Sequence, residues 1–386
     1  MKNPGWKKMT CAVLAAGMLL SSVTPAFAKG RTDAEWAMLR DNILSYNEID
    51  GLINEYNPAV QKNRYELEDY EKHFGSSNAS LRRAYEDLAM EAYASMSLGS
   101  ETDPTYGIDY AKMLAAEAKA QEYEANADKL TDDYETYRLS YEQAEKTLAQ
   151  STKEALVKYF STELSRQQAE LNAALLDSSL SVKNLQLSLG MTTNADVLTA
   201  QESLLNARKA VNDANAQLPL LKKKLQVACG WKYEDDPVLE ALPEPDLARI
   251  NTMNPTADLP AALANNYTLR INQRKLANSN GDSSIDTLKT TIRTNEQNIS
   301  TSLNAAYANV LAARDAYQYA VTNQALQNTN LNVMQNKYAK GGASSIELKT
   351  QETQTKIAQL QALQAKYEVL SAITAYDYAV NGLAGA

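Results

Sequence analysis

Few side chains in this sequence could carry out catalysis. The 386 residues contain one histidine, His73, which lies beside a predicted turn, and two cysteines, and neither type has the spacing of a metal-ligand set. No nucleophile motif and no glycine-rich phosphate loop occurs. The 47 acidic residues are interspersed with lysine and arginine along predicted helix faces, as on a solvated surface. We therefore predict no enzyme activity, no catalytic residue, no metal site and no cofactor.

The most informative spacing surrounds two glycines. Gly190 is followed six residues later by Asp196, and Gly341, with Gly342 beside it, is followed by Glu347 at the same interval. Glycine supplies the left-handed residue that ends a helix, and Thr, Asn or Ser behind it can cap the next helix. Both segments are therefore predicted to be bends between two helices. An acid in the first turn of such a helix can simply complement the helix dipole.

The flanking residues predict long helical hairpins. After Gly190, small and apolar residues recur at alternating steps of three and four, as in a coiled-coil seam: Val197, Ala200, Leu204, Ala207, Val211, Ala214, Leu218, Leu221, Leu225 and Ala228. Before Gly190 we predict a looser seam: Tyr134, Tyr137, Tyr141, Ala144, Leu148, Phe160, Leu164, Leu171, Leu175, Val182, Leu185 and Leu189. Similar seams flank Gly341, so the hairpin is an internal duplication whose two bends should lie at the same end.

Composition restricts the environment and the partners of the chain. Residues 1–28 have the lysines, apolar run and Ala26-Phe27-Ala28 cleavage site of a secretory signal, which leaves Cys229 as the single cysteine and allows no internal disulfide. No later stretch is apolar enough for a membrane helix. A net charge of −9 argues against nucleic acid as a partner. We predict an exported chain whose narrow seams bury apolar faces against each other and against other subunits.

The predicted organisation is a signal peptide at 1–28, a first helical repeat at 29–231, a proline-rich connector at 232–260 and a second helical repeat at 261–386. The hairpin tips are expected near 190 and 341. We predict a new helix at Pro58 with Asn57 as its N-cap, and one continuous helix from Ile108 to Leu189, on the order of 120 Å long. The last five residues are expected to fray.

These features resemble the TolC family of outer-membrane efflux proteins. Residues 57–60, Asn-Pro-Ala-Val, are similar to the family's N-P-x-L opening, and residues 266–269, Asn-Tyr-Thr-Leu, are a degenerate copy. Gly190 with residues 196–201 is similar to the first hairpin tip, and residues 338–348 are similar to the second. The resemblance covers nearly all of the chain after residue 28, and the duplication with two matching tips supports it most.

The resemblance implies an all-α protomer of a helical duct, with tips that dock a periplasmic adaptor. Gly190, Met191, Gly341 and Gly342 would then be the docking tips. Tyr338, Glu347 and Asp196 would lie near an aperture, while Asn57 and Pro58 are family-motif positions. The implied partners are two further copies in a homo-trimer, the adaptor, and an inner-membrane pump such as an ABC or RND transporter. The implied location is the cell envelope.

The sequence departs from the family at the membrane strands. Each family repeat carries two strands of ~9–11 alternating residues. The turn at 278–282 has no room for them, and residues 75–110 are predicted to be helix and turn. We therefore expect a duct protomer with little or no β-structure. The alternative is a secreted or surface-associated coiled-coil scaffold without a transport role. A pump adaptor is a third hypothesis, but it would need β-rich flanking domains that the sequence does not indicate.

Overall fold

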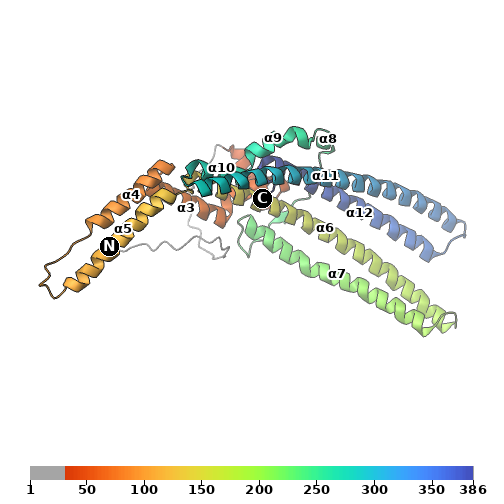
Figure 1. Cartoon of the computed structure of the whole chain (residues 1–386). Coiled ribbons are helices and arrows are strands. Elements are labelled where there is room, and N and C mark those ends of the chain that lie inside the picture. Colours follow the sequence, from red (N-terminus) through yellow and green to blue (C-terminus); the bar gives the residue numbers. More distant parts are fainter. Residues whose placement is uncertain (1–30, 386) are drawn as a thin grey trace.

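The computed structural model describes residues 31–385, and nearly all of them are helical (Figure 1). The predicted signal peptide lies outside the described residues. The first repeat contains a short lead, two short helices, an extra helical hairpin and a long hairpin: α1 (Asp33–Leu39), β1 (Ile43–Leu44), a 3₁₀ turn (Tyr46–Glu48), α2 (Ile49–Tyr56), α3 (Pro58–Phe74), α4 (Asn78–Ala94), α5 (Tyr106–Lys129), α6 (Tyr134–Ser188) and α7 (Asn194–Ala228).

The connector and the second repeat follow the same plan without the extra hairpin. Their elements are β2 (Val238–Leu239), α8 (Leu247–Ile250), α9 (Pro255–Asn265), α10 (Tyr267–Asn278), α11 (Asp282–Ala339), α12 (Ser345–Tyr378) and a π-helical turn (Ala379–Leu383). Where the first repeat inserts α4 and α5, the second has only the tight turn 279–281 between α10 and α11. The prediction of two tandem helical hairpins with almost no β-structure is confirmed.

The four long helices form a single curved layer in the order α7, α6, α12, α11. Each hairpin packs against itself, and α6 packs along α12 to join the two hairpins. Both hairpin tips lie at one end of the molecule, while α4 and α5 project from the other end (Figure 1). In this layer α6 and α12 have neighbours on both sides. Along most of its length, α7 has one neighbour, and the part of α11 nearer the tip also has one.

Two apolar cores lie where the hairpins meet the shorter helices. The first contains Ile49, Ile53, Leu156 and Leu225, together with Tyr367 of α12. The second gathers residues from α8 through α12: Ile250, Leu269, Ile299, Leu303 and Tyr376. The two-residue strands β1 and β2 pair in parallel and tie the connector to the lead. Towards the tips, each hairpin retains only its own seam.

The predicted seam of α7 is confirmed, since each of its ten residues is at least partly buried. In α6 the prediction is wrong for Ala144, Val182, Leu185 and Leu189, which are exposed. The reason is that α6 packs on α7 and on α12, so its buried residues follow a wide arc rather than one seam. The three exposed residues near the tip lie outside that arc. Pro219 is accommodated within α7 without ending it.

The predicted single helix from Ile108 to Leu189 is also wrong, because the chain breaks between Lys129 and Tyr134. Two asparagine side chains accommodate this break by donating to its carbonyls: Asn78 to Leu130 O at 3.3 Å and Asn278 to Thr131 O at 3.0 Å. Asp133 then caps α6. Polar partners from α4 and α10 therefore take over what the helical bonds would have provided.

Two further predictions at element ends need correction. Helix α9 begins at Pro255, earlier than the predicted start at Ala261, because Asn254 caps it and proline suits the first helical position. The predicted frayed tail is instead packed. Ala384 is 1% exposed, and the Asn266 side chain donates to its carbonyl at 2.7 Å. In contrast, α3 begins at Pro58 with Asn57 as its cap, as predicted.

Candidate functional site: the hairpin tips and the hairpin roots

Both tips end their first helix with the same hydrogen bonds. Gly190 has φ 69° and Gly341 has φ 71°. The next residue donates back across the turn, Met191 N to Gln186 O and Gly342 N to Lys337 O, each at 2.8 Å. This is the Schellman arrangement, in which a left-handed residue satisfies the last carbonyls of a helix. No atom lies within 4 Å of where a Cβ would stand at either glycine, so φ alone favours glycine there.

In each hairpin, the helix that follows the tip, α7 or α12, begins with a capping box. Thr193 Oγ1 accepts from Asp196 N at 3.2 Å, and the Asp196 carboxylate accepts from Thr193 N at 3.1 Å. Ser344 and Glu347 make the equivalent pair, with Glu347 N at 3.3 Å from Ser344 Oγ and Ser344 N at 2.7 Å from the carboxylate. The two acids that match the family's aperture positions are therefore bonded to the first turn of their own helices.

These hydrogen bonds stabilise the charged form of both carboxylates. The Thr193 hydroxyl, its backbone N–H and the Thr192 hydroxyl lower the pKa of Asp196 to about 2. The Ser344 backbone N–H, followed by its hydroxyl, lowers the pKa of Glu347 below its usual value. Both groups are ionised at neutral pH. The structure thus gives them a local role in helix initiation, and their place at an aperture stays a prediction.

The tips present apolar side chains to solvent. Met191 is 71% exposed and Tyr338 is 45% exposed, and Leu189 beside the first glycine is also exposed. Lys349 of α12 donates to Ser178 of α6 at 2.5 Å, and beyond this contact the two hairpins diverge towards their tips (Figure 1). The two bends therefore lie at the same end of the molecule and are both accessible, although Gly190 and Gly341 come from opposite halves of the sequence (Figure 1).

At the opposite end of the long hairpins, an asparagine in each repeat joins the start of the repeat to its end. Asn57 Oδ1 accepts from Ala59 N and Val60 N, and its Nδ2 donates to Ala228 O at 2.7 Å. In the second repeat, Asn266 makes the same kind of bridge by capping α10 and donating to carbonyls at the chain's end. We call this pair of bridges the root latches.

A glycine completes each root latch. Gly230 has φ 87°, and a Cβ there would lie 2.4 Å from Tyr56 O. Gly382 has φ 120°, and a Cβ there would lie 2.7 Å from Asn265 O. In both repeats the backbone just before the capping asparagine occupies the space that a side chain would need. This explains why a glycine follows each tip at an interval of about forty residues.

The sequence did not indicate the ion pair that joins the two repeats. Asp133 has a fully buried side chain and pairs with Arg274 of α10 at 2.5 Å. Lys275 pairs with Asp132 at 2.8 Å beside it. The only signal was Asp133 standing three residues before Thr136, which is a capping pattern. Nothing local predicted its partner in the other repeat.

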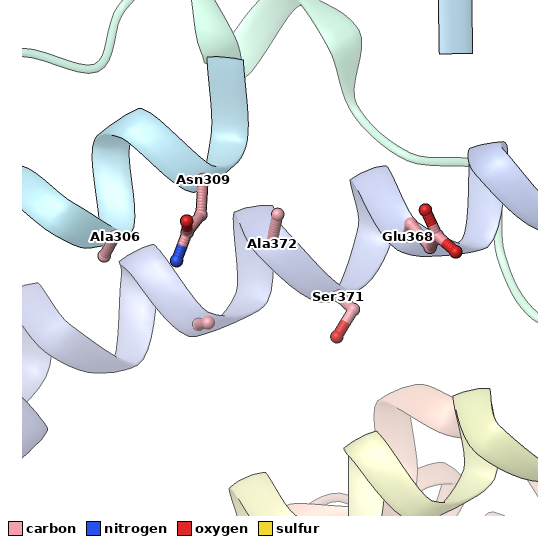
Figure 2. A pocket seen from close by; sticks show the side chains of 6 residues that line it. Ala306, Asn309, Glu368, Ser371 and Ala372 are labelled. Carbon is pink, nitrogen blue, oxygen red and sulfur yellow. The ribbon is translucent and has the colours of Figure 1, made fainter. Parts of the chain in front are cut away.

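Within residues 31–385, no three His, Cys, Asp or Glu side chains lie close enough to hold a metal ion. His73 is exposed and contacts Asp69 on its own helix. Burial raises the pKa of the Cys229 thiol to about 12, so this cysteine is an apolar packing residue. A shallow hollow of about 290 Å³ lies between α11 and α12, and four of its six lining residues are alanine or serine (Figure 2). Asn309 and Glu368 are its other two lining residues.

The comparisons with known proteins give the fold. No family model and no curated protein matches the sequence. The structure is similar to the crystal structure of the CmeC outer membrane channel of Campylobacter jejuni, with a TM-score of 0.54 and 10% identity over 95% of this chain and 94% of that one. It is also similar to crystal structures of CusC that describe folding and transmembrane channel formation, with a TM-score of 0.53 and 11% identity over 92% of this chain and 96% of that one.

The chain has the TolC-type helical fold. A membrane protein from Pseudomonas aeruginosa is similar as well, with a TM-score of 0.52 and 12% identity over 87% of this chain and 90% of that one. In the described part of this chain, no helix has an apolar stretch long enough to cross a membrane.

Proposed function

We propose that this chain is one protomer of a TolC-like export duct in the cell envelope, closed by contact between copies. The observation that carries this proposal is the single layer of four long helices with two open edges. In a single layer, each outer helix has a neighbouring helix on one side only. The open sides of α7 and α11 therefore need neighbours that the chain itself does not supply.

Both edges carry exposed apolar residues at heptad spacing. On α11, Tyr319, Leu326 and Val333 are seven residues apart and 75%, 55% and 49% exposed. On α7, Leu198 and Leu205 are one heptad apart, and both are 64% exposed. Residues seven apart lie on one side of a helix, which is the pattern of a seam that a second helix covers.

Two different edges that bind each other generate a ring when the rotation between copies closes. In the proposed duct, α7 of one copy packs against α11 of the next, and three copies complete the ring, as the TolC resemblance implies. The two tips of each copy then lie at one mouth of the duct. There, Gly190, Met191, Gly341 and Gly342 contact a pump adaptor, which links the duct to an inner-membrane pump.

Sedimentation of the mature chain at about 10 µM tests this proposal. A trimer supports the duct, and a strict monomer supports the scaffold hypothesis instead. The variant Leu198→Asn with Leu205→Asn should dissociate the oligomer, because each substitution removes an apolar side chain from the α7 edge. The matched control Ile108→Asn changes an equally exposed apolar residue away from the edges and should leave the mass unchanged.

Adaptor docking is tested separately on the assembled oligomer. Met191→Asp should abolish binding to a cognate adaptor while the sedimentation of the duct stays that of the wild type. Wild-type adaptor affinity in this variant would remove the first tip from the docking surface.

A further inference from the structure

The α4–α5 hairpin is the element that the duct does not use. It leaves the body at the end opposite the tips, and the second repeat has no counterpart (Figure 1). Ring contacts fix its root to the body, since Tyr70 of α3 contacts Phe74 and Phe74 contacts Tyr85 of α4. Tyr85 in turn contacts Tyr123 of α5 at 6.2 Å. We call the part beyond this contact, residues 86–122, the distal hairpin.

The distal hairpin exposes many large apolar side chains. Met90 and Ile108 are 61% and 60% exposed, and four others are between 37% and 45% exposed: Tyr93, Leu98, Tyr110 and Leu114. Single exposed apolar residues are ordinary, but six of them within one short projecting hairpin indicate an element that binds a partner.

The same hairpin is strongly acidic. Residues 86–122 contain eight carboxylates and two lysines, a net charge of −6. Both lysines are engaged within the hairpin, since Lys112 pairs with Asp109 at 3.2 Å and Lys119 lies over the Tyr123 ring at 5.5 Å. Glu86, Asp87 and Glu91 lie around Met90 on α4, and none of the three makes an ion pair in the described residues. Their charge is available to a partner.

We propose that the distal hairpin is a docking surface for a basic protein, whose contact face carries apolar side chains surrounded by lysine or arginine. Charge complementarity selects this occupant. A second copy of the hairpin would bring another net charge of −6 against the first, and like charges facing each other oppose association. An anionic lipid surface is disfavoured for the same reason. This proposal does not depend on duct closure, because it concerns the opposite end of the molecule.

The test uses a 24-residue helical peptide with leucine on one face and lysine on the other, titrated into the mature chain by fluorescence anisotropy. A twin peptide with glutamate in place of lysine is the first control. The lysine peptide should bind at least about tenfold more tightly, and its affinity should fall as salt rises from 50 to 200 mM, because exposed charges are screened. Equal binding of the two peptides would overturn the proposal.

Variants then locate the binding. Ile108→Asn with Leu114→Asn should weaken lysine-peptide binding about tenfold or more, and Glu86→Gln with Glu91→Gln should weaken it and reduce its salt dependence. The control Met38→Asn changes a similarly exposed apolar residue on α1 and should bind like the wild type. Helicity measured by circular dichroism should be unchanged in all three, since the substituted residues are exposed.

Three results would overturn the assignment. The first is wild-type peptide affinity in both hairpin variants. The second is co-sedimentation of the chain with phosphatidylglycerol vesicles that the Ile108 variant abolishes. The third is self-association that the same variant abolishes. The first two results leave the duct proposal untouched. The third is distinguishable from duct closure, because self-association through the hairpin would persist in Leu198→Asn with Leu205→Asn, whereas duct closure would not.

Discussion

The root latch of the first repeat gives the sharpest stability prediction. Asn57 is 6% exposed, and its side-chain amide forms two kinds of hydrogen bond. The oxygen caps α3, and the nitrogen donates to Ala228 O at 2.7 Å. Replacing it with alanine removes a cap, which costs about 1 kcal/mol. It also leaves the part-buried carbonyl of Ala228 without this donor, at a cost of about 1–3 kcal/mol. The Asn57→Ala variant should therefore lose roughly 2–4 kcal/mol of stability.

Two further variants separate these contributions. Asn57→Asp keeps an acceptor for the cap and loses the donor to Ala228 O, so it should lose about 1–3 kcal/mol. Asn212→Ala changes an exposed asparagine within α7 and should stay within about 0.5 kcal/mol of the wild type. The assay is urea unfolding followed by helical circular dichroism. Hydrogen exchange at the amides of Ala59 and Val60 then reports the cap locally.

The reasoning is refuted by either of two outcomes. One is an Asn57→Ala variant whose urea midpoint equals that of the Asn212→Ala control. The other is an Asn57→Asp variant with full wild-type stability, which would show that the bond to Ala228 contributes nothing.

Three other predictions follow from the same geometry. Gly230→Ala should lower the unfolding temperature much more than Gly190→Ala, because both have positive φ but only Gly230 has a carbonyl oxygen 2.4 Å from the new Cβ, and equal shifts would contradict this. The pKa of Asp196 is lowered to about 2 from an unfolded value of about 3.9, so its stabilisation is present above about pH 4 and lost as pH falls to about 2. A carboxyl-carbon NMR titration should therefore show a midpoint near 2, and a midpoint near 4 would disprove the capping argument. Arg274→Met leaves the buried Asp133 carboxylate without its ion pair. It should cost about 3 kcal/mol in urea unfolding, the lower end of the range for a broken buried pair because Arg274 is itself partly exposed, whereas an unchanged midpoint would show that the pair adds no stability.

Local patterns in the sequence predicted the long hairpins well. The bends at Gly190 and Gly341, the cap at Asn57 and the seam of α7 depend on neighbours within one or two helical turns, and these interactions are visible in a single stretch of sequence. The interval from each tip to Gly230 or Gly382 was also visible. Its cause, the approach of another segment's backbone, required the structure.

What the sequence missed depends on contacts between distant segments. The break before α6 is held by Asn78 and Asn278 and by the ion pair between Asp133 and Arg274, whose partners lie on α4 and α10. The exposed residues of α6 followed from its two helical neighbours, which one-dimensional periodicity cannot show. The heptad of exposed residues on α11 was readable in advance, but only the order of the helices identifies it as an open edge.

The most direct test of the proposed duct is a photo-crosslinker in place of Leu205 on α7, in an oligomer mixed from isotopically labelled and unlabelled copies. We predict crosslinks between copies that map to α11, around the exposed stripe formed by Tyr319, Leu326 and Val333. Crosslinks confined to a single copy, or crosslinks between the α7 helices of two copies, would contradict closure of the wall through its two unlike edges.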